Sequence, residues 1–191
     1  MGGVLCRLND PIETFGLRIS HDEFLRDWIL SQAVREFERG AIDENTFSRN
    51  FVLEANLPYD AAEFLQRFDA WPDRLFPGTI ELLESIPQHY VRAVLSNTNA
   101  VHWNRAEIGG LLEKSIENIF LSCKTGFLKP DTQAYEHVVV TLGCEPHEVL
   151  FFDDNPINVH AAEDFGYRSV LIKEFDDLHS ALLANAIIQA N

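Results

Sequence analysis

Residues 149–166, VLFFDDNPINVHAAEDFG, narrow the choice of architecture for this chain more than any other segment. An apolar run ends in two adjacent acids, Asp153 and Asp154, and Asn155-Pro156 then opens a stretch with a helical pattern that stops at Gly166. Short apolar runs are typical of buried parallel strands, and Asn before Pro is a helix start. We therefore expect both carboxylates at the carboxyl edge of an α/β sheet, where such sheets bind ligands.

Two neighbouring carboxylates at a strand end repel each other, and a hard cation relieves that repulsion. Oxygen ligands together with water suit Mg²⁺, so the pair Asp153 and Asp154 is predicted to bind this ion. These two residues alone leave an alternative open, in which one acid caps the following helix and the other is solvated.

Strands and helices alternate from residue 76 onward, with strands expected at 91–95, 119–122, 149–152 and 169–172. This alternation predicts an α/β fold with a parallel sheet covered by helices on both faces. Residues 20–71 have helical patterns without a strand between them, and the first helix is expected to run from a capping box of Ser20 and Glu23 to Arg39-Gly40. They predict a small helical insertion. Its aromatic side chains are expected to form its core: Phe24, Trp28, Phe37, Phe47, Phe51 and Phe64.

Composition limits the partners and the compartment. The 191 residues carry a net charge of -15, which argues against nucleic acid and anionic membranes as partners. No run is long and apolar enough for a membrane span, and no signal-peptide pattern opens the chain. Cys6, Cys123 and Cys144 are scattered and odd in number, so they predict neither a disulfide framework nor a zinc site. We expect a cytoplasmic monomer.

Three polar sites are expected on one sheet edge. Ser96 and Asn97 end a strand, Lys129 precedes a helix, and the acid pair ends a later strand. Hydroxyl and amide groups donate hydrogen bonds to phosphoryl oxygens, and an ammonium stabilises their charge, so the set indicates phosphoryl transfer. Taken singly, Ser96 and Asn97 are equally explained as a turn, and Lys129 as a solvated surface side chain.

Three segments now point to a family. VLSNTN, FLKPDTQAYEHV and residues 149–166 resemble motifs II, III and IV of the haloacid dehalogenase (HAD) superfamily. Within it they resemble the subgroup of the α-D-glucose-1-phosphate phosphatases and the N-terminal phosphatase domain of epoxide hydrolase. FERGAIDENTFSRNF resembles that subgroup's cap. The resemblance implies a Rossmann-like three-layer core, residues 1–14 and 73–191, and a helical cap, residues 15–72.

The resemblance also implies roles. Ser96 and Asn97 would hold the substrate phosphoryl group, and Lys129 would stabilise that group and the nucleophile. Asp154, helped by Asp153, would bind Mg²⁺. The implied activity is that of a Mg²⁺-dependent phosphatase for a small phosphorylated metabolite, with sugar phosphates as one candidate class.

Motif I departs from the family pattern. The family's nucleophilic Asp, which forms an aspartyl-phosphate intermediate, aligns directly before Met1, and the strand that carries it would be central. We therefore expect Met1 to be an internal methionine of a longer product. Gly2 stands where many members have a second acid, so only its carbonyl is left as a metal ligand and no side chain there can act as general acid.

Three other functions use some of the same residue types. A catalytically inactive protein that binds phosphate and metal, or has a regulatory role, would fit the sequence as it stands. Dehalogenation on the same fold does not need the metal pair, so Asp153 and Asp154 weigh against it. Phospho-receiver domains use similar groups, but their acid pair comes first in the chain and their lysine last, the reverse of this order.

Overall fold

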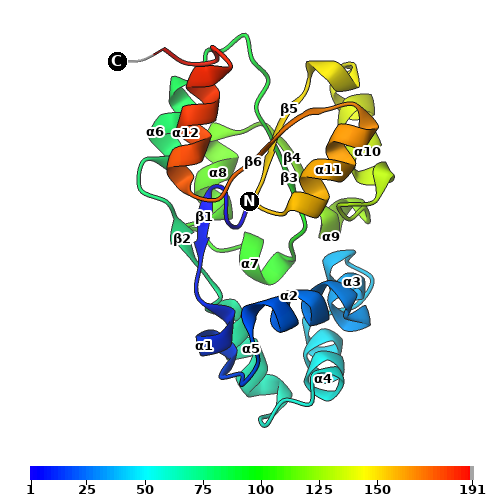
Figure 1. Cartoon of the computed structure of the whole chain (residues 1–191). Helices are drawn as coiled ribbons and strands as arrows, with labels where there is room; N and C mark the ends of the chain where they lie inside the picture. Colours follow the sequence, from blue (N-terminus) through cyan, green and yellow to red (C-terminus); the bar gives the residue numbers. More distant parts are fainter. Residues whose placement is uncertain (190–191) are drawn as a thin grey trace.

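Five helices form one body of the molecule, which we call the helical part. The computed structural model describes residues 1–189, and the five helices lie together at one end of it (Figure 1). Their bounds are α1 (Pro11–Phe15), α2 (His21–Leu30), α3 (Gln32–Glu38), α4 (Glu44–Glu54) and α5 (Ala61–Asp69).

The start of α2 agrees with the sequence, but its end does not. Ser20 and Glu23 form the expected capping box. The pattern predicts one helix up to Arg39, whereas the structure breaks it at Ser31, which caps α3. Glu54 at the end of α4 explains the break, because it accepts hydrogen bonds from the Ser31 hydroxyl at 2.9 Å and from two backbone amides at the start of α3.

Aromatic side chains fill the interior of the helical part, as the sequence predicts. Five of the six predicted core residues are buried, and the sixth, Trp28, is half-buried and packs against them. Phe15 and Phe68 complete the cluster. This core is separate from the clusters of the rest of the chain. The division into a cap of residues 15–72 and a core stays a prediction.

The remaining elements make up the α/β part, which occupies the other end of the molecule (Figure 1). Its strands are β1 (Cys6–Leu8), β2 (Pro72–Leu75), β3 (Ala93–Ser96), β4 (Asn118–Leu121), β5 (Leu150–Asp153) and β6 (Arg168–Leu171). Its helices are α6 (Thr79–Ser85), α7 (Ala100–Trp103), α8 (Gly109–Ser115), α9 (Ser122–Thr125), α10 (Thr132–Leu142), the 3₁₀ helix η1 (Pro146–Glu148), α11 (Pro156–Phe165) and α12 (Phe175–Ala184).

The strands associate in pairs. β3 pairs with β4, and β5 pairs with β6, both in the predicted parallel direction. The α/β class and the parallel pairing are thus confirmed, although the single sheet we expected is divided. Within residues 1–189, no strand pairs with both β3 and β5. β1 and β2 form an antiparallel pair that the sequence does not predict, because both are short and carry charged side chains.

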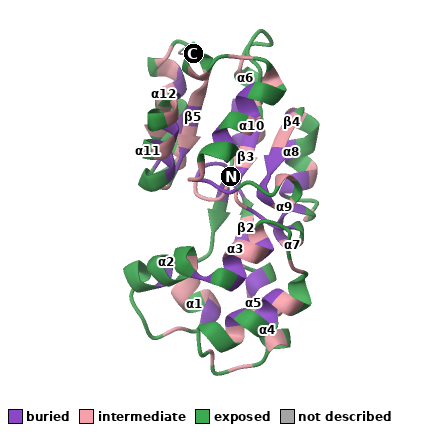
Figure 2. Cartoon of the chain, turned by 90° about the vertical axis from the view of Figure 1, so that its right-hand side faces the viewer, coloured by how far each residue is buried: buried purple, intermediate pink, exposed green. Residues whose placement is uncertain are grey.

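An apolar cavity of about 480 Å³ lies where the strand pairs meet the helices. Its lining includes Leu95 of β3, Phe151 of β5, Leu82 of α6 and Leu182 of α12. Figure 2 shows that the buried residues of the α/β part gather on the inner faces of these elements. The first residues of the chain reach the same interior, because Val4 and Cys6 are buried in the cluster that includes Leu82 and Leu182.

Several contacts join the parts, and two of them involve the strands and α7. The chain passes between them through β1 and β2, which lie side by side (Figure 1). His102 of α7 makes a second link, since its Nε2 lies 2.7 Å from the Phe68 carbonyl oxygen at the end of α5. Within residues 1–189, none of the helices combines the length and the apolar character needed to cross a membrane.

Candidate active site

Lys129 joins the ends of the two parallel strand pairs. Its Nζ donates to the Leu95 carbonyl oxygen of β3 at 2.9 Å and to Asp153 Oδ2 of β5 at 2.6 Å. The lysine and aspartate side chains are only 4% and 3% exposed. Lys129 is therefore not the solvated surface residue of the alternative explanation. A buried ammonium bridges two strand ends that do not pair with each other.

Both carboxylate oxygens of Asp153 accept hydrogen bonds. Besides Lys129, the Asn155 backbone amide and the Asn158 side chain each donate to its Oδ1 at 2.9 Å. Burial alone would raise the pKa of Asp153, but the Lys129 ammonium, the amino group of Met1 and the hydrogen bonds from Lys129 and Asn158 outweigh it and lower the pKa below its ordinary value. The carboxylate is thus ionised at neutral pH.

Asp154 lies against the first residues of the chain. Gly3 has a φ of +72°, and a Cβ placed on it would lie 2.1 Å from Asp154 Oδ2. Glycine is required here for both its backbone angle and its missing side chain. Burial of the carboxyl group, with the neighbouring Asp153, raises the pKa of Asp154. Gly2, the third predicted metal ligand, directly precedes Gly3, which lies against the Asp154 carboxylate.

Ser96 and Asn97 lie beside Lys129 but differ in their contacts. Ser96 is 3% exposed, and its hydroxyl donates to the Asn97 carbonyl oxygen at 3.3 Å. The Asn97 side chain holds the backbone of Lys129 at both ends: its amide donates to the Lys129 carbonyl and its oxygen accepts from the Lys129 amide, each at 2.9 Å. This geometry makes Asn97 a support of the Lys129 loop.

The donor set at the strand end suits a hard cation. Within the described part of the chain, no three His, Cys, Asp or Glu side chains are grouped so that they could hold a metal ion. A cation here would be held by Asp154 and Asp153, with main-chain oxygen such as that of Gly2 and with water or substrate oxygen. These are the ligands that Mg²⁺ accepts, because it keeps several waters in proteins.

The side chains of His102, Trp103 and Arg105 pack against neighbouring elements and do not line the site. His102 and Trp103 are buried, and the Trp103 indole donates to Glu113 at 2.8 Å. The Arg105 guanidinium donates to the Asp69 carbonyl oxygen at 2.9 Å. All three side chains thus join helices to their neighbours.

Asn158 is a site residue that sequence reasoning missed. It lies on α11, one turn beyond Asn155, and is buried with its amide on Asp153. Its position on the buried face of α11, whose other buried residues are Val159 and Ala162, is the signal that could have found it.

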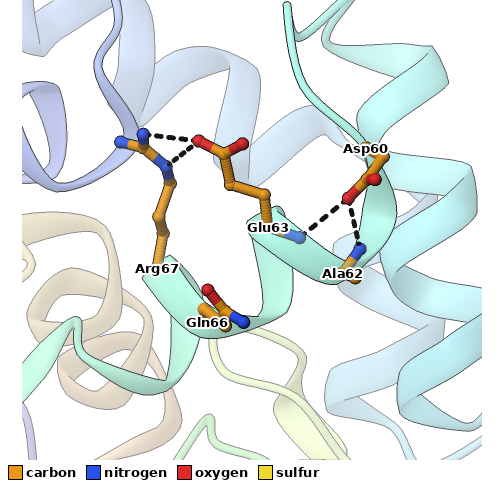
Figure 3. Close-up of a pocket in the computed structure, with 5 residues that line it drawn as sticks. All are labelled: Asp60, Ala62, Glu63, Gln66 and Arg67. Atoms are coloured by element: carbon orange, nitrogen blue, oxygen red, sulfur yellow. Dashed lines mark hydrogen bonds and ion pairs between the residues drawn. The ribbon is translucent and has the colours of Figure 1, made fainter.

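Figure 3 shows a hollow on the helical part, lined by Asp60, Ala62, Glu63, Gln66 and Arg67. Its charged groups already have partners: Asp60 caps α5, and the Arg67 guanidinium pairs with Glu63 at 2.7 Å. We assign the hollow no chemistry.

Comparison with known proteins identifies the family. The model of the haloacid dehalogenase-like hydrolases matches residues 10–166. Flavin mononucleotide hydrolase 1 of Arabidopsis thaliana, whose name places it in the chloroplast, is 31% identical over 75% of this chain and 58% of its own length. Bifunctional epoxide hydrolase 2 of Sus scrofa is 32% identical over 41% of this chain and 14% of its own length. The chain thus spans only part of the length of these relatives.

A solved structure has the same fold. A HAD family enzyme of Bacteroides thetaiotaomicron, in complex with magnesium and inorganic phosphate, superposes with a TM-score of 0.70 at 24% identity. The match covers 90% of each chain.

Proposed function

Because the chain belongs to the haloacid dehalogenase-like hydrolase family, we propose that it is a Mg²⁺-dependent phosphatase for a small phosphorylated metabolite. The observation that carries the proposal is the buried pair of Lys129 and Asp153, 2.6 Å apart, at the ends of β3 and β5. Phosphoryl transfer is catalysed mainly by positioning and by fixed positive charge, and this pair supplies both.

Each residue has a distinct task in this proposal. Lys129 neutralises the negative charge on the phosphoryl oxygens, and Asp153 and Leu95 fix the position of its ammonium. Asn97 holds the backbone of Lys129, and Ser96 offers its hydroxyl to a phosphoryl oxygen. Asp154 and Asp153, with the Gly2 carbonyl, hold Mg²⁺, which when bound offsets the charge of the phosphate.

The relatives support the finer features of the proposal. The Arabidopsis relative is named for hydrolysis of flavin mononucleotide, and the Bacteroides enzyme holds magnesium and inorganic phosphate. We extend magnesium use and phosphatase activity to this chain. Sugar phosphates, the class implied by the sequence motifs, are the first substrates to screen. The proposed compartment is the cytoplasm, which rests on the scattered cysteines and not on the Arabidopsis relative, whose name places it in the chloroplast. The helical part would act as the cap that covers the site and selects the leaving group.

An aspartyl-phosphate route needs a carboxylate at the motif I position, directly before Met1 in the alignment given above. The test therefore uses two proteins, the 191-residue chain and a form extended upstream in its own reading frame. Hydrolysis of p-nitrophenyl phosphate is measured with Mg²⁺ and with EDTA. We expect Mg²⁺-dependent turnover by a form that carries the motif I aspartate.

Lys129→Met gives the decisive comparison. It should lower kcat/KM by about 10²-fold or more, because a fixed charge on the phosphoryl group is lost. Lys124→Met removes an exposed lysine from α9 and should leave kcat/KM unchanged. Absence of turnover in both forms, with phosphate still bound, would favour the binding or regulatory protein instead.

A further inference from the structure

One face of α3 is turned toward the Lys129 loop. Arg35, Glu38 and Arg39 are spaced i, i+3 and i+4, so they share a side of the helix. Both arginines reach Asp131, which precedes α10 just beyond Lys129, with Nη2 to Oδ2 distances of 3.5 Å for Arg35 and 2.7 Å for Arg39. Glu38, between them in sequence, is therefore directed to the same region of the α/β part.

The backbone after α3 fixes this orientation. Gly40 has a φ of +71°, and a Cβ placed on it would lie 2.3 Å from the Cys123 carbonyl oxygen of α9. No larger residue fits at such a close approach. The end of α3 is thus held against the α/β part both by ion pairs and by main-chain contact.

Glu38 is a half-buried carboxyl in this junction. Its burial raises its pKa to about 7, although Lys129 and Arg35 act in the opposite direction. Lys129 from the loop, Arg35 from its own helix and Cys123 from α9 are the titratable groups that face it. Within residues 1–189, its carboxyl accepts no hydrogen bond, so its proton is not engaged by the protein.

We propose that Glu38 is the general acid that protonates the leaving group. The inference rests on the phosphatase function proposed above. Glu38 would take the role of general acid, which residue 2 cannot fill because glycine has no side chain. The bond between phosphorus and the leaving oxygen breaks with its electron pair on that oxygen, while the nucleophilic oxygen forms a new bond to phosphorus. Glu38 gives its proton to the leaving oxygen, which departs as an alcohol, and regains a proton from water.

The test compares two leaving groups in the form that carries the motif I aspartate, which is the wild type for these rates. Glu38→Gln keeps the shape of the side chain but has no proton to give. It should lower kcat/KM for an alkyl phosphate such as glycerol phosphate by about 10²-fold, since an alkoxide needs protonation. Turnover of p-nitrophenyl phosphate should stay within about twofold, because nitrophenolate leaves unprotonated. Glu36→Gln, on the same helix and bound by Gln32, is the matched control and should change neither rate.

Two further readouts separate a chemical from a structural role. Alkyl phosphate turnover by the wild type should fall above about pH 7, and this limb should vanish in Glu38→Gln. A ¹³C titration of the Glu38 carboxyl in the 191-residue chain should have a midpoint near 7 and needs no turnover. A midpoint at the ordinary glutamate value, or equal losses on both substrates, would overturn the assignment of Glu38 alone. Absence of turnover of both substrates by the form that carries the motif I aspartate would refute the phosphatase function and the assignment with it.

Discussion

At the scale of single residues, the candidate site depends most on the buried charge of Lys129. Its ammonium and the Asp153 carboxylate lie 2.6 Å apart out of contact with water, so each charge depends on the other. Removing one partner of a buried pair leaves an uncompensated charge, at a cost of about 3–5 kcal/mol. Any loss of activity in a Lys129 variant therefore has to be read beside its unfolding midpoint.

Gly3 tests whether Asp154 binds the metal. Gly3→Ala places a methyl group on the Asp154 carboxylate, so we expect Mg²⁺ affinity, measured by calorimetry, to fall at least about tenfold through displacement of the ligand. The backbone strain alone should cost about 1 kcal/mol of unfolding free energy.

Gly143→Ala is the matched control for this change. Gly143 has a similar φ of +67° at the end of α10, and a Cβ placed on it meets no atom within 4 Å. This variant should lose the same stability and keep its Mg²⁺ affinity. Equal affinity in the two variants would remove Asp154 from the metal site.

Some of these residues could be predicted and others could not. Strand ends are marked by apolar runs that stop at polar residues, so Ser96, Lys129 and Asp153 were expected at one edge, where the lysine now contacts the aspartate. The Asn97 contact to the Lys129 backbone and the pairing of Arg39 with Asp131 leave no such pattern. Both join segments far apart in sequence, and only the folded chain brings these together.

At the scale of elements, the break between α2 and α3 is the clearest departure from the sequence pattern. Helical periodicity continues through Ser31, and a distant residue, Glu54, stabilises the interruption. We expect Glu54→Ala to lower the free energy of unfolding by about 1–2 kcal/mol, because it leaves the first amides of α3 unsatisfied.

Urea unfolding measures this loss. Glu84→Ala, at an exposed position of α6, serves as its control and should lie within about 0.5 kcal/mol of the wild type. If the two variants unfold at the same urea concentration, the α4 carboxylate does not hold the start of α3.

At the scale of the whole molecule, the arrangement of the two parts decides what the site can do. The helical part has its own aromatic core and meets the α/β part through few groups: the β1–β2 connection, the arginines of α3, Gly40, His102 and Arg105. The sequence predicts both parts, because their hydrophobic periods differ. It does not predict how they meet, since the contacts that join them are polar and specific to the folded state.

His102 makes that junction sensitive to pH. Neutral imidazole suits the site, because Nε2 can donate to the Phe68 carbonyl oxygen while Nδ1 accepts from the Asn99 amide. Burial lowers the pKa of His102 to about 4, against about 6.5 in the unfolded chain. The unfolded chain therefore binds the extra proton between these values, so the stabilisation is complete above pH 6.5 and is lost as the pH falls toward 4.

From pH 7 to pH 4.5, this one group should remove about 2–3 kcal/mol from the free energy of unfolding. Urea unfolding at both pH values measures the loss in the wild type and in His102→Asn. The asparagine side chain at position 102 does not titrate in this range. The fall with pH should be smaller in the variant by that amount. His147→Asn, which changes an exposed histidine of η1, should keep the full wild-type fall. An equal fall in wild type and His102→Asn would mean that the imidazole accepts a proton without disturbing the contact between α7 and α5.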